Sequence, residues 1–161
     1  MKGPNAFQRG FQRFASLRPM AWVFRHTAHH LDRATAKLTK GRTLSGMLAG
    51  IPNIMLTTTG AKSGQQRTVP LVGLNIDGNI AIVGTRFGSH EHPGWYHNLM
   101  KNPAATVEVN GTVTPVTARL VQPGSEYDRI MATADGVYTG YAKYRSRITD
   151  RQIPFFMLEA S

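Results

Sequence analysis

The fold of this chain is set by the stretch Thr59-Gly60-Ala61-Lys62-Ser63-Gly64-Gln65-Gln66-Arg67-Thr68-Val69-Pro70-Leu71. Residues 54–58 before it are apolar or β-branched, and the apolar character continues after it at Val69, Leu71, Val72 and Leu74. Glycines bound the middle of the stretch at Gly60 and Gly64, where a chain reversal needs conformational freedom. The pattern predicts two antiparallel strands joined by a hairpin turn.

The same turn carries hydrogen-bond donors. Lys62 and Arg67 supply two cations, Ser63 supplies a hydroxyl, and the glycines let backbone N–H groups approach a ligand closely. Such donors suit phosphate or carboxylate oxygens. A solvated basic hairpin loop has the same composition, and the stretch is not a Walker loop, so the residues alone leave both interpretations open.

Length and composition indicate one domain. The chain has 161 residues, 41% of them hydrophobic, which is enough for a real core. It has no cysteine, which excludes disulfides, thiolate catalysis and Cys-based zinc or iron–sulfur sites. No apolar run reaches the length of a membrane span and no signal peptide is visible, so we expect a cytoplasmic protein. The net charge of +10 predicts an anionic partner: nucleic acid, acidic lipid or a polyanionic cofactor.

Residues 1–45 are predicted to form a basic amphipathic helical segment, separate from a barrel domain in residues 46–161. The segment carries a single acid, Asp32, against the basic residues Lys2, Arg9, Arg13, Arg18, Arg25, Arg33, Lys37, Lys40 and Arg42. After Pro19, a helix would place an apolar face opposite a cationic one. Such a helix packs on the domain core, or binds the anionic inner face of the cell membrane. Different ends of the segment could serve both roles. The aromatic residues suited to insertion there are Phe7, Phe11 and Phe14.

From residue 54 onward the chain is rich in short strands separated by turn signals. Asp77-Gly78 and Asn110-Gly111 each lie between two β-rich segments, which predicts two type I′ hairpins. We expect three helices after the first hairpin. The first spans residues 94–100, with Pro93 suited to the first helical position, the second runs from Glu126 to a stop at Asp135-Gly136, and the third lies around residues 138–147. A strand at residues 154–158 would close the fold. Short antiparallel strands with few helices predict a small closed barrel or sandwich.

Two further clusters lie between the hairpins. Residues 84–88 form a glycine-containing loop with a cation, Arg86, and so resemble the first loop in character. Residues of metal-ligating type follow at His90, Glu91, His92 and His97. They lack the helical i, i+4 spacing of a zinc protease, so no metal site is expected. Trp95 offers a flat wall for a planar ligand, although an aromatic residue on a short helix also serves as core.

Tyrosines recur at three-residue spacing, at Tyr138, Tyr141 and Tyr144, and so share one side of the expected helix. A phenol donates a hydrogen bond or a proton to a developing oxyanion, and its ring forms an apolar wall. Packing in the core is the commoner use of tyrosines at this spacing. The sequence contains no Gly-x-Ser-x-Gly motif, so nothing supports nucleophilic hydrolysis.

Taken together, these motifs resemble the deazaflavin-dependent nitroreductase family of actinobacteria. The resemblance covers about residues 54–158, in the same order and spacing. The segments that carry it are 58–64 with Arg67 and 70–71, then 84–88, then 92–99 with 102–103, the tyrosine triplet and residues 149–154. The combination is far more specific than any one of these motifs alone.

The resemblance implies a β-rich α+β fold, a split β-barrel with a few short helices, that binds coenzyme F420, a deazaflavin with a phospholactyl and oligoglutamate tail. Its reduced form, F420H2, would transfer hydride to an electron-poor acceptor: a quinone, an activated enone such as an unsaturated lactone, or a nitro compound. The cofactor-binding residues that it implies are Lys62, Ser63, Gly64, Arg67, Thr68, Val69, Pro70, Leu71, Gly84, Thr85, Arg86, Pro93, Trp95, Tyr96 and Asn98.

For catalysis, the resemblance points to Tyr141 as the donor to the acceptor oxygen, with Tyr138 and Tyr144 as pocket walls. Arg86-Phe87 stands where relatives carry Lys-Gly, so Phe87 is expected to narrow the pocket, whereas Gly94 leaves room near the cofactor ring. An FMN-binding split-barrel oxidoreductase remains an alternative. So does a non-enzymatic basic protein that binds anionic lipid or nucleic acid, although no nucleic-acid motif is visible.

Overall fold

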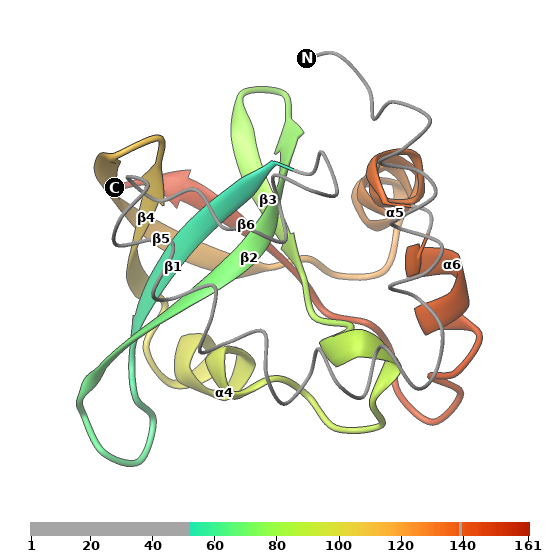
Figure 1. Ribbon diagram of the computed structural model, residues 1–161, viewed down its shortest axis with the longest axis horizontal. Coiled ribbons are helices and arrows are strands. Elements are labelled where there is room, and N and C mark those ends of the chain that lie inside the picture. Colours follow the sequence, from blue (N-terminus) through green and yellow to red (C-terminus); the bar gives the residue numbers. More distant parts are fainter. Residues whose placement is uncertain (1–51, 139) are drawn as a thin grey trace.

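The computed structural model describes residues 52–138 and 140–161, which fold into a closed barrel of antiparallel strands in the order β1-β2-β3-β6-β5-β4 (Figure 1). The strands are β1 (Asn53–Thr59), β2 (Gln66–Ile76), β3 (Asn79–Val83), β4 (Ala104–Val109), β5 (Thr112–Leu120) and β6 (Phe155–Ala160). The predicted β-rich barrel is therefore confirmed. The amphipathic helix predicted in residues 1–45, and the domain boundary placed after it, lie outside the described residues.

The hairpins predicted from the sequence are present. Thr59 pairs with Gln66 at the end of the β1–β2 hairpin. In the β2–β3 turn, Asp77 and Gly78 have φ of 50° and 89°, and the Asn110-Gly111 turn between β4 and β5 likewise has positive φ at both residues. Type I′ turns need positive φ at both central positions, which these residue types tolerate. The turns therefore fix the register of β2 on β3 and of β4 on β5.

Strand β6 separates two hydrophobic cores. Successive side chains of a strand point to opposite faces. Phe156 therefore packs inside the barrel with Leu56 and Ile82, while Phe155 packs in the second core with Ile130. These five side chains are almost fully buried. Burial on both faces explains why the strand is apolar from Phe155 to Leu158 rather than alternating.

The described helices are η1 (Arg86–Gly88), α4 (Gly94–Lys101), α5 (Ser125–Val137) and α6 (Gly140–Arg145). Helix α4, at the bottom of the view, packs against β1, whereas α5 and α6 pack against each other at its right, with α5 also contacting β2 (Figure 1). None of the described helices is long and apolar enough to cross a membrane.

Some helix bounds differ from the expectation. Pro93 is the residue before α4, with extended backbone at ψ 154°, and not its first helical residue. Helix α5 ends at Val137, one residue past the expected stop at Asp135-Gly136, and the amide of Tyr138 still donates to the carbonyl of Ala134 (2.9 Å). One glycine in a helix costs only about 1 kcal/mol, which packing can offset. Helix α6 lies within the expected residues 138–147 but is shorter.

Candidate functional site

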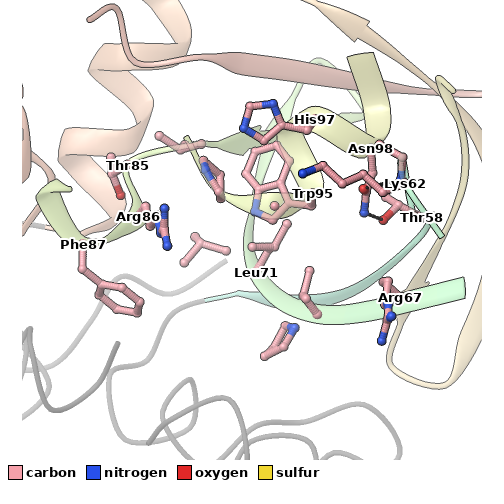
Figure 2. Close-up of a pocket in the computed structure, with 18 of the residues that line it drawn as sticks. Thr58, Lys62, Arg67, Leu71, Thr85, Arg86, Phe87, Trp95, His97 and Asn98 are labelled. Carbon is pink, nitrogen blue, oxygen red and sulfur yellow. Dashed lines mark hydrogen bonds between the residues drawn. The ribbon is translucent and has the colours of Figure 1, made fainter. Parts of the chain in front are cut away.

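A cavity of about 1070 Å³ opens between the β1–β2 loop, strand β2, the η1 loop and helices α4 and α6 (Figure 2). It brings together side chains that are far apart in the sequence. The cofactor-binding residues predicted from the sequence that line it are Lys62, Ser63, Arg67, Val69, Pro70, Leu71, Thr85, Arg86, Pro93, Trp95 and Asn98. Two of the three predicted catalytic tyrosines, Tyr141 and Tyr144, line it as well.

Four predicted cofactor contacts lie outside this lining. Gly64 occupies the hairpin turn, where its φ of 67° favours glycine. The hydroxyl of Thr68 bonds that of Thr57 across the β1–β2 pair (2.8 Å). The amide of Gly84 donates to a backbone carbonyl (2.9 Å). Tyr96 stacks on the ring of His92, with centroids 4.1 Å apart.

The third tyrosine, Tyr138, is 8% exposed, and its ring packs edge-on against Tyr141, 5.2 Å between centroids. Its hydroxyl is 3.0 Å from that of Tyr144. Tyr138 therefore supports the two tyrosines that line the cavity, and it is not itself part of the lining.

Several lining residues are missing from the sequence-based set: Thr58, Gly60, Ala61, Val72, Val83 and His97. Thr58 carried only a weak signal, because it and Thr59 precede the glycine loop on opposite faces of β1 and the sequence does not say which one faces the cavity. Val72 and Val83 carried none. An apolar strand residue faces one side or the other according to register, and only the folded barrel decides which.

Helix α4 holds the basic hairpin loop in place. The Asn98 side-chain carbonyl accepts from the amide of Ala61 (2.9 Å), and its amide group donates to the hydroxyl of Thr58 (3.0 Å). The Lys101 ammonium donates to the carbonyl of Ala61 (2.6 Å). The Asn98 amide thus serves loop positioning, while the residue also borders the cavity.

We expect Asn98→Ala to lower the free energy of unfolding by about 1–3 kcal/mol, because it removes two partly buried hydrogen bonds and leaves the hydroxyl of Thr58 without this donor. Chemical denaturation measures the change. Asn79→Ala, at an exposed strand position, is the control and should stay within about 0.5 kcal/mol of the wild type. Equal stability of the two variants would contradict the anchoring role.

One end of the cavity is cationic. Lys62 and Arg67 come from the hairpin loop and the start of β2, and Figure 2 shows both at the same side of the cavity as Asn98. Arg67 donates to the side chain of Gln65 (3.1 Å). Arg86, farther along, is paired with Glu91 and also donates to the carbonyl of His92 (3.3 Å). None of the described residues that line the cavity is acidic.

The other end is aromatic. Phe87, Tyr141 and Tyr144 line it, and Phe87 meets Tyr144 edge-on with centroids 6.2 Å apart. Burial raises the pKa of Tyr141 and of Tyr144 above the ordinary value for a phenol. Both hydroxyls therefore stay protonated at neutral pH, so this end can donate hydrogen bonds but offers no anion.

The histidines beside α4 do not gather into a metal site: no group of three His, Cys, Asp or Glu side chains able to hold an ion occurs in residues 52–138 and 140–161. Burial, helped by Arg151 and His97, lowers the pKa of His92. The ring that stacks on Tyr96 is therefore neutral near pH 7.

The chain is similar to known proteins over most of its length. The chain matches the F420H(2)-dependent quinone reductase family over residues 25–160. An F420H(2)-dependent quinone reductase of Mycobacterium tuberculosis is 35% identical over 142 residues, which cover 85% of this chain and 95% of that protein. The solved structure of an F420-H2 dependent reductase (FDR-A) is 40% identical, with a TM-score of 0.61 over 67% of this chain and 94% of the other.

Further solved structures share the architecture. One described as a domain-swapped dimer is 34% identical, with a TM-score of 0.63, and covers 88% of this chain and 99% of its own. A FAD-binding protein from Mesorhizobium loti is 15% identical, with a TM-score of 0.51, and covers 80% of this chain and 86% of its own. At the lower identity the likeness extends to the fold alone.

Proposed function

This chain belongs to the F420H(2)-dependent quinone reductase family, and on that premise we propose that it is an oxidoreductase that uses F420H2 to reduce a quinone. The observation that carries the proposal is a single cavity with Lys62 and Arg67 at one end and aromatic side chains, with Arg86 beside them, at the other. Anionic groups suit the first end and planar rings the second.

The residues present fit the cofactor. A phosphate and carboxylates on its tail would meet Lys62, Ser63 and Arg67, with no acidic residue in the described lining to repel them. The volume of about 1070 Å³ lies at the upper end of small-molecule sites, so it leaves room for an acceptor beside the ring system. The side chains proposed to hold the ring system are those of Val69, Pro70, Leu71, Thr85, Pro93 and Trp95.

Bound F420H2 would supply the hydride, and the protein would orient the partners and exclude water. Trp95 is only 7% exposed and packs edge-on against Phe156, so it forms a rigid wall. Tyr141 would hold a hydrogen bond to the acceptor oxygen, where negative charge develops. Because burial raises the pKa of Tyr141, its phenol acts there as a donor that keeps its proton.

We propose a planar, electron-poor acceptor for the aromatic end. A quinone fits this description and agrees with the family description. Activated enones, unsaturated lactones and nitro compounds share the required electrophilic carbon or polar oxygen, and they form the wider set to screen. Phe87 narrows this end, so the proposal favours flat acceptors over bulky ones.

A fluorescence titration of the purified protein with F420, repeated with FMN and at raised salt, tests the cofactor assignment. We expect binding of F420 at micromolar concentration or tighter, weakened by salt because the tail contacts are ionic. Turnover of F420H2 with a series of quinones, enones and nitro compounds then ranks the acceptors. Binding of FMN in place of F420 would overturn the assignment and favour a flavin-dependent split barrel instead.

We propose, in addition, that the basic segment in residues 1–45 contacts anionic membrane. The support is its composition in the sequence, with a single acid, and the family's quinone substrate class, since long-tailed quinones reside in membranes. Co-sedimentation with vesicles that contain anionic lipid compares the full chain with a truncation before Pro19. Unchanged vesicle binding by the truncated chain would remove this part of the proposal.

A further inference from the structure

Arg151 lies just before β6, outside the cavity lining, and its guanidinium is directed at the loop that follows β3. It donates to the carbonyls of Ser89 (2.9 Å), His90 (3.0 Å) and Gly84 (3.2 Å), with a longer contact to Thr85 (3.4 Å). These acceptors are more than sixty residues away in the sequence. One side chain thus gathers carbonyls from both ends of residues 84–90.

The loop that it holds has unfavourable backbone conformations. Arg86 and Phe87 have φ of 46° and 56°, and Gly88 follows at 80°. The left-handed region costs a residue other than glycine roughly 1 kcal/mol or more, so it persists only where the surroundings enforce it. A bulky aromatic residue such as Phe87 is among the least expected there.

Contacts inside the loop do not by themselves fix its place in the protein. The amides of Gly88 and Ser89 donate to the carbonyls of Thr85 (3.0 Å) and Arg86 (3.1 Å) within the loop itself. The Arg86–Glu91 pair is also local. The hydrogen bonds of Arg151 instead tie the loop to the chain that enters β6 and so to the barrel. The Gly84 amide, which donates to the carbonyl of Pro154 (2.9 Å), and the exposed pair of His90 with Asp150 (2.9 Å) join the same two segments, but neither contacts the carbonyls of residues 85–90 that Arg151 gathers.

The loop forms one wall of the cavity. Thr85, Arg86 and Phe87 line it, and Phe87 stands against Tyr144. In Figure 2, Phe87 lies at the far end of the cavity from Lys62 and Arg67, which is the end assigned to the acceptor. The position of Phe87 therefore decides the width of that end.

We propose that Arg151 is a positioning residue, which holds Phe87 at the wall of the cavity through the carbonyls of residues 84–90 and so determines which acceptors fit. Arginine suits this role because its planar fork carries five N–H donors in fixed directions. A lysine ammonium is a point charge on a flexible stem and cannot reach the same set of carbonyls. The kinetic part of the inference rests on the proposed function, but the structural part does not.

Amide hydrogen exchange in the cofactor-free protein tests the structural part. We expect Arg151→Lys to speed exchange at Gly88 and Ser89 by about tenfold or more, because the loop opens more often once the carbonyl contacts are lost. Arg119→Lys removes a guanidinium fork that pairs with Glu126 and Glu159, away from the cavity, and is the matched control. Exchange at Gly88 and Ser89 that is equal in the two variants would overturn the inference.

Kinetics at saturating F420H2 test the link to Phe87. A one-ring and a two-ring quinone are compared in the wild type, Arg151→Lys, Phe87→Ala and the double variant. We expect Arg151→Lys to change the ratio of the two KM values by about fivefold at saturating F420H2, and to add little in the Phe87→Ala background. Effects that multiply in the double variant would show that Arg151 does not act through Phe87, and would overturn the inference.

A second variant and the exchange measurement cover the cases in which Arg151→Lys or the kinetic assay fails. If Arg151→Lys is too unstable to purify, Arg151→Gln, whose amide retains two donors, serves the same measurements. If the wild type does not oxidise F420H2 with any acceptor, the proposed function fails, and the exchange rates at Gly88 and Ser89 alone decide on Arg151.

Discussion

Replacing both Lys62 and Arg67 by alanine is expected to raise the Kd for F420 by about 10- to 100-fold, because charge-assisted hydrogen bonds to phosphate or carboxylate oxygens are the strongest polar contacts available at this end. The loop is exposed, so screening by salt keeps the effect below that of a buried pair. The turnover number at saturating cofactor should change little, because neither side chain lies at the aromatic end.

Fluorescence titration with F420 at two salt concentrations measures the change in Kd. The wild-type Kd should rise with salt more steeply than that of the double variant, which has lost two of the contacts that salt weakens. The matched control is Arg129→Ala with Lys143→Ala, which removes the same charge from residues outside the cavity lining. An equal loss of affinity in the control would mean that net charge alone attracts the cofactor. Intact affinity with lost turnover in the Lys62 and Arg67 variant would contradict the tail-binding role.

Local chemistry explains why most of the fold could be predicted. The Asp77-Gly78 and Asn110-Gly111 pairs specify their turns by themselves, because their residue types accept the positive φ that a type I′ turn requires. The stop expected for α5 at Asp135-Gly136 was one residue early, since α5 ends at Val137. A composition signal places a helix end only to within a residue or two.

The site was predictable where a residue's chemistry identifies its use. Lys62, Ser63 and Arg67 stand out because two cations and a hydroxyl in or beside a glycine-bounded turn suit an anion, although only the combination with the other motifs favours that interpretation over a solvated loop. Arg151 does not stand out, because its role depends on carbonyls that only the closed barrel brings within reach. Asn98 lines the cavity, as expected of a cofactor contact. Its side-chain amide, however, is already hydrogen-bonded to Thr58 and to the backbone of Ala61, which the sequence alone did not indicate.

Tyr141→Phe is expected to lower kcat by about 10- to 100-fold with little change in the Kd of F420, because the phenol hydrogen bond would be formed mainly as charge develops on the acceptor oxygen. Burial raises the pKa of this phenol, so its acid form persists beyond the ordinary value near 10. The rate should therefore not fall through loss of this proton as the pH rises toward 10, and it should fall only above it.

Steady-state kinetics measures the loss of kcat, and a pH profile of the rate tests whether the phenol keeps its proton up to pH 10. Tyr127→Phe is the matched control: it also removes a phenol hydrogen bond, to the carbonyl of Ile153 (2.9 Å), but lies outside the cavity lining. Tyr144→Phe separates the two lining tyrosines, since the hydroxyl of Tyr144 is already engaged with that of Tyr138 (3.0 Å) and should matter less. If Tyr144→Phe lost more activity than Tyr141→Phe, the donor assignment would move to Tyr144. If neither variant lost activity, the donor to the acceptor oxygen would have to be a group other than a phenol.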